Sequence, residues 1–564
     1  MDDQKIRSLC ETLILLWACC SWAPQKLALG RSLANGQPFE LEAWALSLTG
    51  WVGVFALYVA RREVLPFEWR DVTRKCLDSG LLYGTSLVAM SLGAHLLHPS
   101  DEDSQRHVRL NFWTSVANTL NTSFMLVLTL LFGDDKPEPI VYKLGRCALS
   151  SAIIAKVALD PIRLGQHAYL ITGVFMFEFV AEIVRMGLKK SFTMGEALLV
   201  VQFLSLGTTD FVALTASRLV PQSTPYYATH RREVDVALEG GLLGVVWLAV
   251  LLAPYFKANA HTENETIGVD PLTRKRVNSL SSVKVLDWDT MTFRNGLLFY
   301  VTCVAVLVLF VAPWVAFLLG QNPIAFVATF TMSTWTHMFV LVYWVGCLVL
   351  GLPMIHYAAT TGNQTLIIVR KLYHLLALVM FAPAIKYAPD FLALSFGLAT
   401  AVLLGLEYIR VCRVPPFGSF LNAFMRAYTD SRDEGMFILT HIYLLLGCAV
   451  PVWVSSDNIA PYAGVLILGA GDAAAAVVGS TMGKLRWIGG RKTVEGTISG
   501  IVAIILCAEF FFQVWLKDEM SLAEIGAYRK RVVIASITTC ALEAFTTQID
   551  NLVLPLFFVS ALRM

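Results

Sequence analysis

The run LLFYVTCVAVLVLFVAPWVAFLL, from Leu297 to Leu319, decides the fold class of this chain. It contains no charged side chain, and as a helix it is long enough to cross a bilayer core of about 30 Å. A second uncharged run, from Ile324 to Leu352, follows shortly after it. Backbone polar groups in lipid must be hydrogen-bonded within the protein, so runs of this kind indicate helices. We therefore predict an all-α, polytopic transmembrane protein.

The composition of the whole chain supports this prediction. Of its 564 residues, 56% are hydrophobic and 15% are charged, whereas soluble domains are about a quarter charged. We count roughly 14 to 17 candidate spans of sufficient apolar length. The formal net charge of +2 gives no sign of nucleic-acid binding, so the predicted environment is membrane lipid. The 11 cysteines show no CxxC or zinc-type spacing, and we interpret them as small packing residues.

Polar content divides the chain into three regions. The longest polar stretch, 257–294, contains TRKR and several serines, which indicates a flexible loop. It separates an N-terminal transmembrane region, 1–256, from a C-terminal transmembrane region, 295–564. Within the first region, Glu178 and Glu182 lie four residues apart on one face of an apolar helix. Acids inside a membrane warrant a functional hypothesis, but we favour a packing or helix-end role for this pair.

The densest polar pattern lies in LGAGDAAAAVVGSTMGKLRWIGGRKTVEGTISG, from Leu468 to Gly500. A carboxylate, Asp472, stands inside an apolar segment, and a basic loop follows it. Carboxylate and phosphate oxygens are ligands for Mg²⁺ or Ca²⁺, and cationic side chains neutralise phosphate. The pattern predicts phosphoryl-transfer chemistry with a divalent metal. The candidate metal ligands are Asp472, Glu495 and Asp550, and the candidate phosphate-binding cations are Lys484, Arg486, Arg491 and Lys492.

Glycines and one histidine complete the candidate site. Glycine lets backbone N–H groups approach a phosphate closely, and we expect this of Gly471, Gly490 and Gly496. His441 is a candidate catalytic residue, with an orienting or core histidine as the alternative. The candidate catalytic set is therefore Asp472, Lys492, Glu495 and His441. The sequence leaves open which acid accepts a proton.

Charge placement predicts the side of the membrane on which these residues lie. The cations between Lys484 and Lys492 favour the cytosol under the positive-inside rule. Counting spans from this loop puts Arg370, Asp433 and Asp550 on the same face, as a site built from several helix ends requires. The basic run Arg529–Arg531 opposes this topology, because the same count places it in the lumen.

Several short segments of the C-terminal region resemble one family, the dolichol kinases, which are CTP-dependent polyprenol kinases. They are RKLYHLLALVMFAP from Arg370, LEYIR from Leu406, DEGMFILTHIYLLLG from Asp433, GDAAAAVVGSTMGKLRW from Gly471, RKTVEGT from Arg491 and EAFTTQIDNLVLP from Glu543. They occur in the order in which the family has them. In the N-terminal region, SFTMGEALLV from Ser191 is similar to the eukaryotic enzymes as well.

The resemblance implies transfer of the γ-phosphate of CTP to the terminal hydroxyl of dolichol at the endoplasmic reticulum membrane, with the active site facing the cytosol. The product, dolichyl phosphate, is the lipid carrier for protein N-glycosylation and mannosylation. The family's CTP-binding loop falls on Lys484 to Ser499. Within it, Trp487 could stack on the cytosine ring or act as an interfacial anchor. Thr493, and backbone groups as far as Thr497, could read the edge of the base.

Two other functions compete with this interpretation. A CTP-dependent lipid cytidylyltransferase would use similar metal-binding acids, but its product would keep the nucleotide. A transporter would place its charges near the membrane midplane, often within inverted repeats, and no such repeat is visible. The sequence leaves the oligomeric state open, with a homodimer as one alternative.

Overall fold

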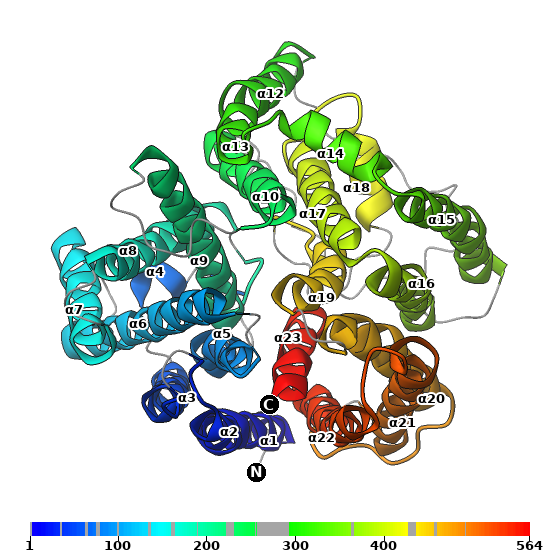
Figure 1. The fold of residues 1–564 in the computed structure, drawn as a ribbon, viewed down its shortest axis with the longest axis horizontal. Helices are drawn as coiled ribbons and strands as arrows, with labels where there is room; N and C mark the ends of the chain where they lie inside the picture. Colours follow the sequence, from blue (N-terminus) through cyan, green and yellow to red (C-terminus); the bar gives the residue numbers. More distant parts are fainter. Residues whose placement is uncertain are drawn as a thin grey trace, which may run out of the picture.

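The computed structural model describes most of the chain as a bundle of helices (Figure 1). The described residues are 3–33, 36–61, 66–70, 72–74, 79–98, 101–133, 137–159, 164–188, 190–220, 231–253, 255, 293–361, 366–426, 436–455, 459–490 and 492–564. The predicted polar loop 257–294 lies almost entirely outside them, as do Arg491 and Asp433. Within these ranges there is no β-strand, and extended pairing is limited to two isolated bridges.

The N-terminal region contributes ten helices to the described part. They are α1 (Asp3–Trp17), α2 (Ala23–Leu29), α3 (Glu40–Arg61), α4 (Phe67–Arg70), α5 (Leu81–Leu96), α6 (Glu102–Phe132), α7 (Ile140–Ala158), α8 (Leu164–Gly187), α9 (Met194–Leu219) and α10 (Glu233–Leu251).

The C-terminal region contributes a second group of helices. They are α12 (Phe293–Val306), α13 (Ala312–Leu319), α14 (Pro323–Met332), α15 (Trp335–Thr361), α16 (Leu366–Tyr387), α17 (Pro389–Val411), α18 (Gly418–Arg426), α19 (Thr440–Val454), α20 (Ala473–Thr481), α21 (Val494–Phe511), α22 (Leu522–Phe545) and α23 (Asp550–Arg563). A π-helical segment, Val465–Asp472, runs directly into α20.

The lengths of these helices confirm the predicted fold class. In the described ranges, 11 helices are long and apolar enough to cross a membrane. Four shorter apolar helices accompany them: Leu81–Leu96, Pro323–Met332, Thr440–Val454 and Val465–Thr481. Many large apolar side chains on α12 to α15 are exposed, as expected of surfaces that face lipid. The protein is therefore an all-α, polytopic membrane protein.

The last helix joins the two regions of the chain. In Figure 1, α23 lies near the centre, and it packs against α19 and α22 on one side and α5 on the other. Two further helix pairs, α10 with α17 and α1 with α22, also join the N-terminal to the C-terminal region. The start of α23 therefore lies where both regions meet.

The start of α9 is fixed tightly at this junction. Thr193 and Glu196 form a capping box, in which each side chain accepts a hydrogen bond from the other residue's backbone N–H. A Cβ added at Gly195 would lie 1.8 Å from the carbonyl oxygen of Gly80, so only glycine fits there. Close backbone contact therefore sets the position of the SFTMGE segment against the beginning of α5.

The acids predicted to have packing roles in the N-terminal region are paired. Glu178 accepts a hydrogen bond of 2.7 Å from Arg146, and Glu182 pairs with Lys143 and Arg185. Arg146 and Arg185 are both buried, so these pairs neutralise charges that burial would otherwise make costly. This arrangement agrees with the packing interpretation.

Candidate functional site

The carboxylate of Asp472 is the centre of a buried polar cluster. Its side chain is 8% exposed and follows the π-helical segment that ends at this residue. Lys371 Nζ donates a short hydrogen bond to Asp472 Oδ2, and His374 Nδ1 lies 3.0 Å from the same oxygen. Lys371 and His374 are three residues apart on α16, so one helical face supplies both partners. The arrangement holds an ionised carboxylate at the inner end of the basic loop.

Lys492 connects this cluster to the basic loop. Its Nζ donates a hydrogen bond of 2.8 Å to Glu543 Oε1, and its side chain is 32% exposed. Burial by itself would lower the pKa of Lys492, but the carboxylates of Glu543, Asp550 and Asp472 hold that pKa above its ordinary value. Lys492 therefore remains a cation facing all three acids. Segments far apart in the sequence meet here, as a multi-helix site requires.

The loop before α21 is a short hairpin. Arg486 and Thr493 form an antiparallel bridge, and the Trp487 N–H donates to the Lys492 carbonyl at 3.0 Å. Gly489 at its tip has φ +75°, a left-handed conformation that favours glycine. Lys484 and Arg486 are exposed along this hairpin. The loop thus presents cations on a defined backbone.

Glu495 is held by the hairpin itself. Its Oε1 accepts hydrogen bonds of 3.0 Å from the backbone N–H groups of both Lys484 and Leu485. Its carboxylate therefore anchors the loop to the first turn of α21. The described residues contain no group of three or more His, Cys, Asp or Glu side chains that could hold a metal. The predicted role of Glu495 as a metal ligand stays a prediction.

The remaining loop side chains make hydrogen bonds with one another. Trp487 Nε1 donates to Thr497 Oγ1 at 2.9 Å, and the indole packs edge-on against Phe545 with ring centroids 5.5 Å apart. Thr493 Oγ1 caps α21 by accepting from the Gly496 N–H at 3.2 Å. These contacts orient Trp487 and use the hydroxyls of both threonines within the loop.

Most of the predicted phosphate-binding glycines allow close packing. A Cβ at Gly471 would lie 2.7 Å from Ile504 on α21, and one at Gly496 would lie 2.8 Å from the Ala475 carbonyl oxygen. These glycines bring α20 and α21 together beneath the loop. Gly490 differs, because a Cβ added there would lie 3.6 Å from the nearest atom, which is ordinary contact. The Gly490 N–H donates a hydrogen bond to the Trp487 carbonyl.

A buried ion pair positions the segment that carries His441. Glu407 and Arg410 on α17 are joined by hydrogen bonds of 2.7 and 2.8 Å. Glu407 also accepts from the Ile438 N–H, and Arg410 donates to the Met436 carbonyl. His441 follows in the first turn of α19. The LEYIR segment therefore has a structural role in presenting the start of that helix.

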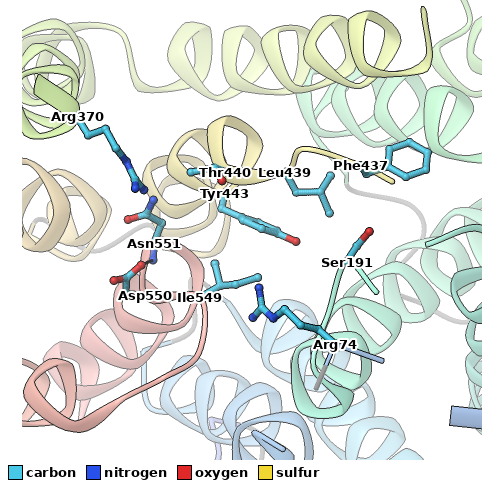
Figure 2. Close-up of a pocket in the computed structure, with 10 residues that line it drawn as sticks. All are labelled: Arg74, Ser191, Arg370, Phe437, Leu439, Thr440, Tyr443, Ile549, Asp550 and Asn551. Carbon is cyan, nitrogen blue, oxygen red and sulfur yellow. Dashed lines mark hydrogen bonds between the residues drawn. The ribbon is translucent and has the colours of Figure 1, made fainter. Parts of the chain in front are cut away.

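A cavity adjoins the cluster at the start of α23. Figure 2 shows Arg370, Asp550 and Asn551 at one end of it, Arg74 and Ser191 at the other, and Tyr443 between them. Arg370 is the neighbour of Lys371, and Asp550 acts electrostatically on Lys492. Arg370 and Asp550 therefore line one cavity, whereas Asp433 and Arg491 lie outside the described residues; that Arg370, Lys492 and Asp550 form one site stays a prediction.

Sequence reasoning missed several residues that the structure brings together. Lys371 and Glu543, the direct partners of Asp472 and Lys492, were not among the candidates. Their signal was present, since RKLYH and EAFTTQIDN are compact polar clusters within apolar helices. Arg74 and Ser191 carried a weaker signal, because their part of the chain has no dense polar motif.

The fold and site define a polytopic membrane protein with a buried carboxylate–lysine cluster beside a basic loop, an arrangement suited to transfer of a phosphoryl group at a membrane. The sequence model of dolichol kinase matches residues 147–511, more than half of the chain. The chain belongs to the dolichol kinase family.

Individual relatives agree with this assignment. Dolichol kinase EVAN of Arabidopsis thaliana is 29% identical over 542 residues, which cover 89% of this chain and 91% of the relative. Human dolichol kinase is 29% identical over 432 residues, which cover 73% of this chain and 72% of the human protein. Dolichol kinase sec59 of Schizosaccharomyces pombe is 33% identical over 264 residues, covering 43% and 51%. No solved structure matches the chain.

Proposed function

We propose that this protein is a CTP-dependent dolichol kinase of the endoplasmic reticulum membrane. It transfers the γ-phosphoryl group of CTP to the terminal hydroxyl of dolichol and forms dolichyl phosphate for protein glycosylation. The observation that carries the proposal is the buried Asp472, paired with Lys371 and close to Lys492 of the basic loop. Family membership supplies the acceptor alcohol.

The chemistry depends on positioning and charge. Phosphoryl transfer requires the donor phosphate to be held in line with the acceptor oxygen while its charge is neutralised. Lys484, Arg486 and Lys492 lie along the loop and supply that positive charge. The dipole of α21 makes its N-terminus slightly positive, which also favours a phosphate nearby. These groups together bind the triphosphate.

The proposal includes a divalent metal held by two carboxylates. Asp472 and Asp550 both face Lys492, and Mg²⁺ usually takes one or two protein carboxylates, with phosphate oxygens and water completing its coordination. Asp472 and Asp550 would hold such a Mg²⁺ or Ca²⁺ ion, which would neutralise charge on the phosphates.

The site faces the cytosol in this proposal. The basic loop favours that side, and the opposing run Arg529–Arg531 is partly neutralised within the structure. Arg529 Nε donates to Glu509 Oε2 at 2.8 Å, and the Arg531 guanidinium lies over the Tyr528 ring. The charge bias against this topology is therefore smaller than the sequence indicates.

In the deciding experiment, purified protein is incubated with dolichol and with CTP that is labelled at either the γ- or the α-phosphate. Label from the γ-position should appear in extracted lipid, and label from the α-position should not. Transfer of the α-label would instead identify a cytidylyltransferase. Equal use of γ-labelled ATP and CTP would contradict the assignment of CTP as the donor.

A further inference from the structure

The Trp487 indole N–H and the hydroxyls of Thr493 and Thr497 already have hydrogen-bond partners within the loop and the start of α21, which leaves these groups less available to a nucleotide base. Trp487 bonds to Thr497 and packs on Phe545, and Thr493 caps α21. The exposed loop cations match phosphates, which every nucleoside triphosphate carries. These contacts leave the choice of base unexplained.

The cavity beside Asp550 has the features that the loop lacks. Ser191 is 5% exposed, and its Oγ has no hydrogen-bond partner among the described residues. A buried polar atom without a partner is costly, so a ligand atom that bonds to it stabilises the complex. Ser191 lines the cavity, where Figure 2 shows it opposite the Arg370 and Asp550 end.

The Ser191 end of the cavity is rigid. Arg74 Nη2 donates to both carboxylate oxygens of Glu196, at 3.1 and 3.2 Å. Glu196 Oε1 also accepts from the Ile549 N–H at 2.8 Å, which ties α9 to the start of α23. Because Glu196 balances the charge of Arg74, this end is suited to an uncharged polar group. The N-terminal region thereby contributes a fixed wall to the site.

The order of side chains along the cavity matches a nucleoside triphosphate. Ser191 and Arg74 lie at one end beside the apolar Phe437 and Leu439, Tyr443 and Ile549 lie in the middle, and Arg370 at the other end is the neighbour of Lys371, the partner of Asp472. A base and sugar would occupy the first two parts and direct the phosphates toward the third. Dolichol fits less well, because its single hydroxyl cannot lie at the Asp472 end of the cavity and also pair with Ser191.

We propose that this cavity is the nucleoside subsite of the kinase, with Ser191 of the N-terminal region hydrogen-bonding the polar edge of cytosine. The inference rests on the proposed function, since it names the part of the donor that the cavity recognises. It assigns the SFTMGE segment a role in binding the base, while the loop binds the phosphates.

Steady-state kinetics of the full-length enzyme test the proposal. Ser191→Ala should raise the KM for CTP about three- to tenfold, as expected for the loss of one hydrogen bond, and leave the KM for dolichol within about twofold. Ser205→Ala is the control, because Ser205 is also buried, on the helix α9 that follows Ser191, but its hydroxyl donates to the backbone carbonyl of Gln202.

Each other outcome has a definite meaning. An increase in the KM for dolichol alone would make the cavity the acceptor site and overturn the proposal, as would unchanged kinetics in Ser191→Ala. If the wild-type protein transfers no γ-label to dolichol, the proposed function fails before this question arises.

Photolabelling of the wild-type protein gives a second test that requires no variant to fold. A 5-azido-CTP probe, irradiated and competed with CTP, should label the peptide that contains Tyr443 or the one that contains Ser191. Labelling confined to the peptide that contains Trp487 would place the base on the loop and overturn the proposal.

Discussion

Replacing Asp472 by asparagine should abolish most of the activity while leaving the fold intact. The substitution keeps the shape of the side chain and removes its charge from a site that is 6% exposed. A carboxylate–ammonium pair at about 4 Å is worth about 4 kcal/mol at an effective dielectric constant near 20. The retained amide oxygen still accepts a hydrogen bond from Lys371, so part of that stabilisation remains.

The effect on catalysis is distinct from the effect on stability. Groups preorganised around a transferring phosphoryl group typically contribute about 10²- to 10³-fold to kcat, and Asp472 holds both Lys371 and His374 in place. We therefore expect kcat to fall at least about 10²-fold. The assay measures transfer of γ-label from CTP to dolichol at saturating concentrations of both substrates, with thermal unfolding in detergent as the check on folding.

Asp210→Asn is the matched control for this experiment. Asp210 is also buried and paired, with His107 at 3.3 Å and Arg231 at 3.2 Å, but it belongs to the N-terminal region. Its loss should lower stability and leave the kcat of the folded protein near normal. Near-normal kcat in a folded Asp472→Asn protein, or an equal loss in Asp210→Asn, would refute the assignment of Asp472.

Three further predictions concern the loop and its surroundings. Lys492→Ala should raise the KM for CTP about tenfold or more, because a charge-assisted contact to phosphate is lost, and should leave the KM for dolichol unchanged. A change in the KM for dolichol alone would make the loop a lipid-binding element. Glu495→Ala should also raise the KM for CTP, because the hairpin loses its anchor, and the concentration of Mg²⁺ needed for activation should stay unchanged. A shift in that Mg²⁺ concentration would show instead that Glu495 binds the metal. Single cysteines placed at Arg486 and at Thr547, a partly exposed position three residues before Asp550, should both react with impermeant reagents on sealed microsomes when the protein is otherwise depleted of cysteine. Labelling of one from the cytosolic side and of the other only after the microsomes are opened would contradict a common cytosolic face.

The sequence alone was sufficient for the fold class. Uncharged runs such as Leu297–Leu319 become membrane-spanning helices because no other backbone arrangement satisfies its hydrogen bonds in lipid. The same reasoning located the glycine-rich stretch that ends in the basic loop, since a carboxylate inside an apolar segment is costly unless it is paired or functional. Both inferences depend on local composition, which a sequence displays directly.

Only the tertiary structure decided which side chains meet. Lys371 lies 101 positions from its partner Asp472, and Glu196 lies 353 positions from Ile549, so no local pattern predicts either contact. Glu495 contacts the backbone of Lys484, only 11 positions away, yet the sequence does not show that its carboxylate is bonded to the loop. Helix packing determines these partners, and it depends on side chains throughout the bundle. The cavity at Ser191 arises in the same way, from two regions of the chain that meet only when the protein is folded.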